Sequence, residues 1–177
     1  MLYQYWKKKQ KLILNKNDKL STNYKDEIKS VIGGYLTQEK NNTKIKKSDL
    51  HCVSNKKARL RIFNDLIFAF KICKHVKSNA IVLVNNKQTV GIGAGQMSRL
   101  DATKIAILKS KTNAKNRLFV AASDAFFPFI DNIKLLIKNN CKGIVQPKGS
   151  INDKKIIEFA NKNNLPLYFT NYRLFKH

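Results

Sequence analysis

The sequence predicts an α/β protein, a three-layer α/β/α sandwich built on a mainly parallel sheet. Over residues 80–170, short apolar runs rich in β-branched residues alternate with segments of helical periodicity. The runs are nearly continuous in apolar residues, as is typical of strands covered on both faces. The chain has 177 residues, 43% of them apolar, which is enough for one domain with a substantial core.

The first elements precede this alternating region. Residues 1–27 form a basic, Lys- and Asn-rich lead that we expect to be loosely ordered, and the domain is expected to span residues 28–177. A short element over residues 28–38 is followed by a polar connector that extends to about Asn55. Over residues 58–74, apolar side chains recur at helical spacing, so we expect a largely buried helix there.

A hairpin is expected after that helix. Residues 80–84 form an apolar, β-branched run, and residues 87–92 form a second run. Asn85 and Asn86 lie between them and are a turn signal. Together these segments predict two neighbouring antiparallel strands.

Three glycines at alternate positions begin within the second run and precede a helix expected over residues 99–111. Their spacing does not match the dinucleotide fingerprint G-x-G-x-x-G, and no Lys-Ser/Thr pair follows as it does in a phosphate-binding loop. Glycine permits a positive φ and the close approach of another backbone or a ligand. Ser98 and Asp101 form an S-x-x-D capping pattern for the helix. The glycines are Gly91, Gly93 and Gly95.

Strands and helices then alternate towards the end of the chain. The expected elements are strands at residues 118–122, 143–147 and 167–170, and helices at residues 132–139 and 152–162. Ser150 and Asp153 repeat the S-x-x-D capping pattern before the last helix. Counted from residue 58, the predicted order is α-β-β-α-β-α-β-α-β, with no long linker.

The net charge of +24 raises the question of a nucleic-acid partner. Thirty of the 35 basic residues are Lys, Asn occurs 20 times, and both residue types have A/T-rich codons. Arg, which base readout and phosphate forks favour, occurs only five times, so the charge indicates a solvated surface and no specific nucleic acid. The chain shows no secretory leader and no membrane-spanning run. Three scattered cysteines (Cys52, Cys73 and Cys141) indicate reduced thiols in a cytoplasmic protein.

The chain lacks the residue spacing of two common kinds of catalytic site, a zinc site and a nucleophilic serine. His51, Cys52, Cys73 and His75 contain no C-x-x-C pair, and Cys73 lies on the apolar face of the expected helix, so no metal site is predicted. The segment from Gly95 to Arg99 is not a G-x-S-x-G nucleophile motif, and Ser98 is expected to cap a helix instead.

Polar and aromatic residues instead follow the strand ends. Because loops after parallel strands lie together at one edge of a sheet, we expect these residues to gather there. Taken together they offer aromatic, carboxylate, amide and guanidinium groups, which suit a planar heterocycle that carries phosphate or carboxylates. Alternatively, FFPF is a hydrophobic plug, and Arg99 and Arg173 are ordinary surface ion-pair partners. The segments are SDAFFPFIDN (123–132), QPKGSIND (146–153) and YRLFKH (172–177).

Five motifs in this chain resemble the AICAR transformylase half of a bifunctional enzyme family whose other activity is IMP cyclohydrolase. The motifs are HVKSNAIV, VGIGAGQMSR, SDAFFPFIDN, QPKGSI and TNYRLFKH. They resemble the C-terminal half of the transformylase domain, in order, from about Ile28 to His177. The resemblance implies a cytidine-deaminase-like α/β/α fold without zinc. It also implies transfer of a formyl group from the cosubstrate 10-formyltetrahydrofolate to AICAR ribotide, without a metal, to give FAICAR.

The resemblance also implies roles for individual residues. Asn79, the candidate catalytic residue, would hydrogen-bond AICAR near the reacting centre. Phe126 would pack on that nucleotide, and Arg173 would bind its phosphate. The folate side would be lined by Arg99, Leu100, Asp131, Asn132, Ser150 and Ile151.

The chain departs from the family pattern in three respects. The resemblance covers neither the cyclohydrolase domain nor the first half of the transformylase domain, where family members carry a Lys-His pair in KHVSPAGAA. The pair Lys74-His75 here is not followed by that sequence. Family members have Arg at the position of Ile130 and Gly at the position of Lys148, and both differences lie beside the expected folate surface.

These features leave three hypotheses. In the first, the chain is part of a transformylase, and its partner is a second copy in a homodimer or the missing transformylase half. In the second, the chain is an inactive remnant that retains ligand binding. In the third, it is a basic nucleic-acid-binding protein. We expect a cytoplasmic protein without a membrane partner.

Overall fold

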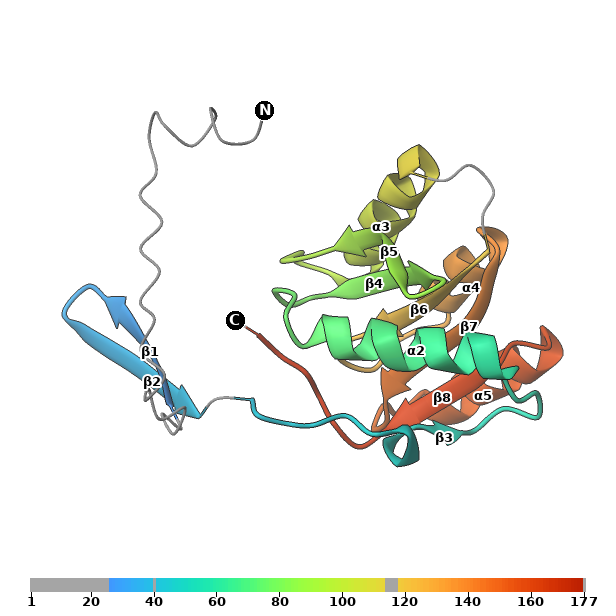
Figure 1. Cartoon of the computed structure of the whole chain (residues 1–177), viewed down its shortest axis with the longest axis horizontal. Helices are drawn as coiled ribbons and strands as arrows, with labels where there is room; N and C mark the ends of the chain where they lie inside the picture. Colours follow the sequence, from blue (N-terminus) through green and yellow to red (C-terminus); the bar gives the residue numbers. More distant parts are fainter. Residues whose placement is uncertain (1–25, 40, 114–117, 177) are drawn as a thin grey trace. The chain divides into compact units, whose positions relative to one another are not determined.

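The computed structural model of the chain describes residues 26–39, 41–113 and 118–176 (Figure 1). The chain divides into two compact units, residues 1–40 and 41–177. In the first unit, β1 (Asp26–Val31) and β2 (Gly34–Glu39) form an antiparallel hairpin, and Gly33 adopts a φ of 84° in its turn. The short element expected over residues 28–38 is this hairpin. Nearly all of the predicted basic lead lies outside the described residues.

The second unit is built on a six-stranded sheet of order β3-β8-β7-β6-β4-β5. Its strands are β3 (His51–Cys52), β4 (Ile81–Asn85), β5 (Gln88–Gly93), β6 (Phe119–Ser123), β7 (Cys141–Pro147) and β8 (Leu167–Thr170). The pairs β6–β7 and β7–β8 are parallel, whereas β4 is antiparallel to both of its neighbours and β3 is antiparallel to β8. Four of the six strands therefore point the same way, which confirms the predicted mainly parallel sheet.

Helices cover both faces of the sheet. Figure 1 shows α2 (Leu60–Cys73) across one face, where Val82 and Val84 of β4 join its core cluster. Ile81 and Leu83 belong to the second cluster, together with α3 (Arg99–Asn113), α4 (Asp131–Lys138) and α5 (Asp153–Lys162). Because successive side chains of a strand point to opposite faces, β4 contributes to both cores. The predicted three-layer α/β class is confirmed.

Two of the three glycines lie in β5 and not in a loop, and the packing of α3 against β5 requires them. A Cβ built on Gly91 would lie 2.0 Å from the backbone oxygen of Ala106, and one on Gly93 would lie 1.9 Å from that of Ala102. The backbone that approaches these two glycines is therefore that of α3. Gly95 differs, because it adopts a φ of 63° beyond the end of β5.

One of the two predicted helix caps is present and the other is wrong. The backbone N–H of Asp101 donates to Ser98 Oγ at 3.0 Å, as the S-x-x-D pattern predicts. Before α5, the N-cap is Asn152, and Ser150 Oγ instead accepts from the Asn152 N–H at 3.1 Å. The Asp153 carboxylate accepts from the Gly149 N–H at 2.8 Å, so Ser150 and Asp153 shape the loop and do not form a capping box.

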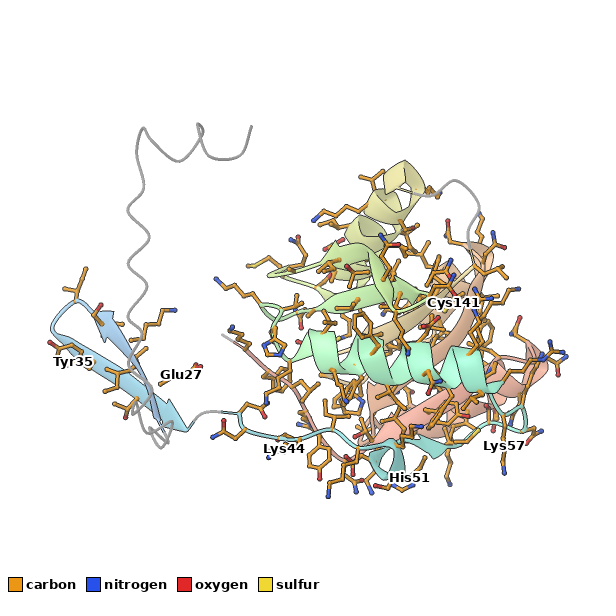
Figure 2. The ribbon with its side chains drawn as sticks, viewed as in Figure 1. Glu27, Tyr35, Lys44, His51, Lys57 and Cys141 are labelled. Atoms are coloured by element: carbon orange, nitrogen blue, oxygen red, sulfur yellow. The ribbon has the colours of Figure 1, made fainter. Side chains whose placement is uncertain are left out.

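The polar connector has more structure than its composition indicates. It contains a short 3-10 helix, η1 (Lys47–Asp49), and strand β3, which pairs with β8 at the edge of the sheet. Exposed lysines such as Lys44 and Lys57 project from this segment (Figure 2). Their exposure agrees with a solvated basic surface.

The three cysteines are free thiols. Cys73 is buried in the core of α2, as its place on the apolar face predicts, and burial raises its pKa well above 9.0. No helix within the described ranges is long and apolar enough to cross a membrane.

Candidate functional site

The sheet topology brings the loops with candidate residues to one edge, which we call the rim. Ile81, the first residue of β4, pairs with Ser123 at the end of β6 and with Gly93 at the end of β5. The ends of β7 and β8 lie at the same edge, where Pro147 pairs with Thr170. The rim consists of residues 77–80, 94–100, 124–131, 148–152 and 171–176.

Asp124 is the centre of the hydrogen bonding at the rim. Its side chain is fully buried, directly after β6. Ser78 Oγ donates to Asp124 Oδ2 at 2.6 Å, and Arg99 Nη2 donates to Asp124 Oδ1 at 3.1 Å. A buried carboxylate needs such partners, because its desolvation is otherwise uncompensated. The ion pair therefore fixes the side chain of Arg99, which is only 11% exposed.

Asn79 is held by the same network. Its Oδ1 accepts from Arg99 Nη2 at 2.9 Å, and its Nδ2 donates to the carbonyl oxygens of Gln96 at 2.9 Å and Met97 at 3.3 Å. These three bonds determine the positions of the oxygen and the nitrogen of the Asn79 amide group. Asn79 and Arg99, predicted on opposite sides of a two-substrate site, are thus in direct contact.

The C-terminal tail is bonded into the rim. The Leu174 N–H donates to the backbone oxygen of Asp124 at 2.9 Å. The Ser78 N–H donates to the Lys176 oxygen at 2.9 Å, and the Lys176 N–H donates to Ser78 Oγ at 3.0 Å. These bonds place Arg173 with its guanidinium carbon 5.2 Å from the centre of the Phe126 ring, a cation–π contact.

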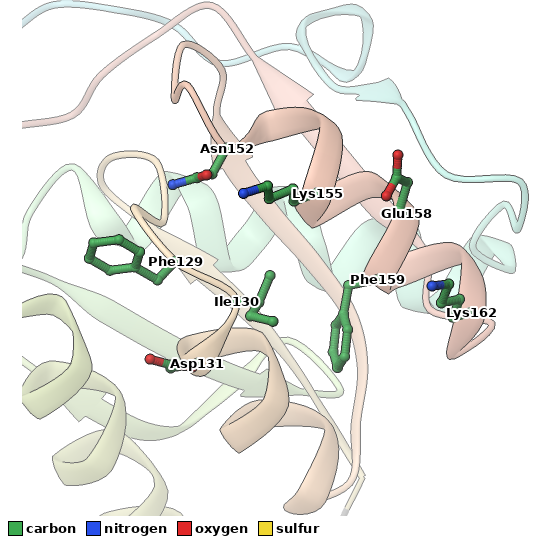
Figure 3. A pocket seen from close by; sticks show the side chains of 8 residues that line it. All are labelled: Phe129, Ile130, Asp131, Asn152, Lys155, Glu158, Phe159 and Lys162. Atoms are coloured by element: carbon green, nitrogen blue, oxygen red, sulfur yellow. The ribbon is translucent and has the colours of Figure 1, made fainter.

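A pocket of about 440 Å³ opens between the start of α4 and one side of α5 (Figure 3). The side chains of Phe129, Ile130 and Phe159 give it an apolar wall. Asp131 and Lys155 are among the charged side chains that line it. The full lining is Phe129, Ile130, Asp131, Asn152, Lys155, Glu158, Phe159 and Lys162.

The other predicted folate-side residues differ in their surroundings. Ser150 is half-buried next to this pocket, and Ile151 is fully exposed at 103%. Leu100 is half-buried in the first turn of α3. Asn132 is buried, and its Oδ1 lies 2.8 Å from Thr103 Oγ1, so its side chain links α4 to α3 inside the protein.

The part of the chain that the structure describes contains no group of three His, Cys, Asp or Glu side chains placed to hold a metal ion. Cys141 is also buried, and burial raises its pKa to about 12, so it is a structural thiol. Two residues of the network, Asp124 and Ser78, were not among the predicted site residues. Both residues lie beside strand ends, Ser78 in HVKSNAIV and Asp124 in SDAFFPFIDN, and this position could have identified them as candidates.

Comparisons with known proteins agree with the motif resemblance. A family model described as the AICARFT/IMPCHase bienzyme matches residues 2–109. The chain is 48% identical over 157 residues to the bifunctional purine biosynthesis protein PurH of Buchnera aphidicola subsp. Baizongia pistaciae, which covers 88% of this chain and 30% of that protein. It is 47% identical over 152 residues to PurH of Chlorobium chlorochromatii, covering 85% of this chain and 29% of the relative.

A third relative extends further along the chain. PurH of Prochlorococcus marinus subsp. pastoris is 41% identical over 171 residues, which cover 97% of this chain and 33% of that protein. The chain thus spans about 30% of the length of the curated relatives it matches.

Proposed function

Because this chain belongs to the AICARFT/IMPCHase bienzyme family, we propose that it is the C-terminal half of the transformylase domain. In this role it takes part in purine biosynthesis, by transfer of a formyl group from 10-formyltetrahydrofolate to AICAR ribotide. The observation that carries the proposal is the gathering of Asn79, Arg99, Phe126 and Arg173 at one rim. A cytoplasmic location follows from this role as a further expectation.

Phe126 and Arg173 suit the nucleotide. An aromatic ring offers a flat face for a planar heterocycle, and a guanidinium group binds phosphate with two parallel hydrogen bonds. Arg173 is exposed, and its Nη2 lies 3.4 Å from where a Cβ on Gly149 would be, so the 148–152 loop is its close neighbour. AICAR ribotide carries both a heterocycle and a phosphate.

Asn79 suits the reacting centre. In the reaction, the 5-amino nitrogen of AICAR bonds to the formyl carbon and the bond from that carbon to N10 of the folate breaks. One proton leaves the amine and one is gained at N10. An amide group held by Arg99, Gln96 and Met97 orients a substrate group without itself taking up a proton. We assign the proton transfer to residues outside this chain, in the other half of the transformylase domain.

The pocket of Figure 3 suits the folate. Phe129, Ile130 and Phe159 offer apolar surface for a fused ring system, and the Asp131 carboxylate offers an acceptor for ring N–H groups. Ser150 and Ile151 lie on the adjoining loop. Ile130 gives this wall an aliphatic side chain where family members carry Arg.

Calorimetric titration with AICAR ribotide tests the nucleotide site. We expect Arg173→Met to weaken binding by about tenfold or more, because a charged hydrogen bond to the phosphate is lost. Arg61→Met is the matched control, because Arg61 is an exposed residue of α2 outside the rim. In a chain of net charge +24, an equal loss in both variants would indicate general attraction of phosphate and would contradict the proposal.

A formyl-transfer assay separates an active part from an inactive remnant. We expect no turnover by these 177 residues alone, since the proton acceptor is assigned to the other half of the transformylase domain. Adding the upstream part of a relative should restore turnover. Binding of AICAR without turnover in that mixture would favour the remnant hypothesis. The Asn79 amide, already engaged in three hydrogen bonds, gives this alternative its support.

A further inference from the structure

Asp124 was not predicted as a site residue, yet its buried carboxylate is bonded to Arg99, which in turn bonds Asn79. Its carboxylate oxygens have separate donors, Ser78 Oγ at 2.6 Å and Arg99 Nη2 at 3.1 Å. Its backbone N–H donates to the Ala80 oxygen at 3.3 Å, next to Asn79. Asp124 is therefore bonded to the loop before β4 and to the first turn of α3, and it lies two residues before Phe126 in the same loop.

The path from Asp124 to Asn79 passes through Arg99. The same Nη2 atom of Arg99 donates to Asp124 Oδ1 and to Asn79 Oδ1. Without the carboxylate, Arg99 would be a buried cation without its counterion and would move towards water. Asn79 Oδ1 would then lose its donor, and the orientation of the amide would no longer be fixed.

A second path leads from Asp124 to Arg173. The Leu174 N–H donates to the Asp124 backbone oxygen, and Ser78 Oγ, which donates to the carboxylate, accepts from the Lys176 N–H. The tail is thus bonded at two positions shortly after Arg173. This arrangement holds the guanidinium group over the Phe126 ring at 5.2 Å.

We propose that Asp124 is the positioning residue of the nucleotide site, which sets the orientation of Asn79 through Arg99 and the place of Arg173 through the tail. The inference rests on the proposed function, because it assigns these residues to binding of AICAR ribotide. It assigns to Asp124 no contact with the substrate.

The test compares Asp124→Asn with Asp65→Asn. Asp65 is the matched control, because it is also buried and accepts two hydrogen bonds, from the N–H groups of Asn86 and Lys87 in the β4–β5 turn. We expect both variants to lower the thermal midpoint. Asp124→Asn should also weaken binding of AICAR ribotide by at least about tenfold, whereas Asp65→Asn should leave it within about twofold. Equal affinities of the two variants would overturn the inference.

A spectroscopic readout in the absence of ligand separates this inference from the proposed function. The side-chain amide signals of Asn79 in a ¹⁵N–¹H NMR spectrum should shift in Asp124→Asn and stay in place in Asp65→Asn. If the unaltered chain does not bind AICAR ribotide, the proposed function fails, and unchanged Asn79 signals would overturn the positioning role separately. Should Asp124→Asn fail to fold, Ser78→Ala removes one donor to the carboxylate and should shift the same signals.

A double variant tests the path through Arg99. In an Arg99→Met background, Asp124→Asn should shift the Asn79 side-chain amide signals little further, because the guanidinium group that links the two residues is already gone. Two fully additive changes would show that Asp124 acts on Asn79 by another route and would overturn this path.

Discussion

Replacement of Gly93 by alanine is expected to destabilise the protein strongly, because no space exists for one methyl group. The added Cβ would lie 1.9 Å from the carbonyl oxygen of Ala102 and 2.6 Å from its carbonyl carbon. Both atoms belong to the backbone of α3, so no side-chain rotation relieves the overlap. To reach an ordinary contact of 3.4 Å, β5 and α3 must separate by about 1.5 Å.

The expected cost follows from this separation. Overpacking a well-packed core costs roughly 1–3 kcal/mol, and a backbone obstacle places Gly93→Ala at the upper end, about 3 kcal/mol. In a protein of this size that loss lowers the unfolding midpoint by about 6–12 °C. Urea unfolding followed by circular dichroism measures the change, and the dependence on urea should stay the same.

Gly143→Ala is the matched control within the same sheet. The two nearest atoms to its Cβ would be side-chain atoms that can move slightly, Ile62 Cγ2 at 3.3 Å and Leu66 Cδ1 at 3.4 Å, and the backbone oxygen of Pro166 would lie at an ordinary contact distance of 3.6 Å. We expect a loss below about 1 kcal/mol for this variant. A Gly93→Ala variant as stable as the unaltered protein, or a Gly143→Ala variant that loses as much, would refute the reasoning about close approach of α3.

Three further predictions concern other parts of the second unit. Cys52, which is half-buried, should react with Ellman's reagent at pH 8 well before Cys141, because burial raises the pKa of Cys141 to about 12 and little thiolate is present; similar rates in the folded protein would contradict this. The hydroxyl of Ser98 and the amine of Lys104 lower the pKa of Asp101 below 3.8, so its stabilising contribution is present at neutral pH and is lost as the pH falls through the folded pKa. Asp101→Asn should therefore be less stable than the unaltered chain at pH 7 in urea unfolding, and the difference should vanish in strong acid; a constant difference would exclude the carboxylate as its cause. Leu66→Ala, in the buried centre of α2, should cost about 2–5 kcal/mol in the same assay, and a cost below 1 kcal/mol would contradict the core assignment.

The sequence predicted the elements that depend on local periodicity. The helix expected over residues 58–74 is α2, and the hairpin expected from residue 80 is β4–β5. Strand β3 was missed because it has two residues in a polar segment and is defined by its pairing with β8, more than a hundred positions away. No local pattern reports such a pairing.

The dependence on structure outside the local pattern also explains why one capping pattern forms a cap and the other does not. Ser98 and Asp101 satisfy each other within one turn, so their spacing alone is informative. At Ser150 and Asp153 the preceding Gly149 has a φ of 113°, which turns its N–H towards the Asp153 carboxylate. The two segments share the S-x-x-D pattern, but the backbone conformation that precedes the serine differs between them.

The candidate site was predicted in part for a related reason. Residues after strand ends could be expected at one edge from the alternation of elements. The role of Asp124 depends on partners 25 and 46 positions away, Arg99 and Ser78, and it becomes visible only when the strands are placed. Likewise, the glycines indicated a close approach, but only the packing of α3 identifies what approaches Gly91 and Gly93.

The bonding of the tail to Ser78 and Asp124 has a consequence for hydrogen exchange. Because the amide hydrogens of Leu174 and Lys176 are donated within the rim, they exchange with deuterated water only when the tail detaches. The rate at which these two backbone amides take up deuterium therefore measures how often the tail detaches from the rim.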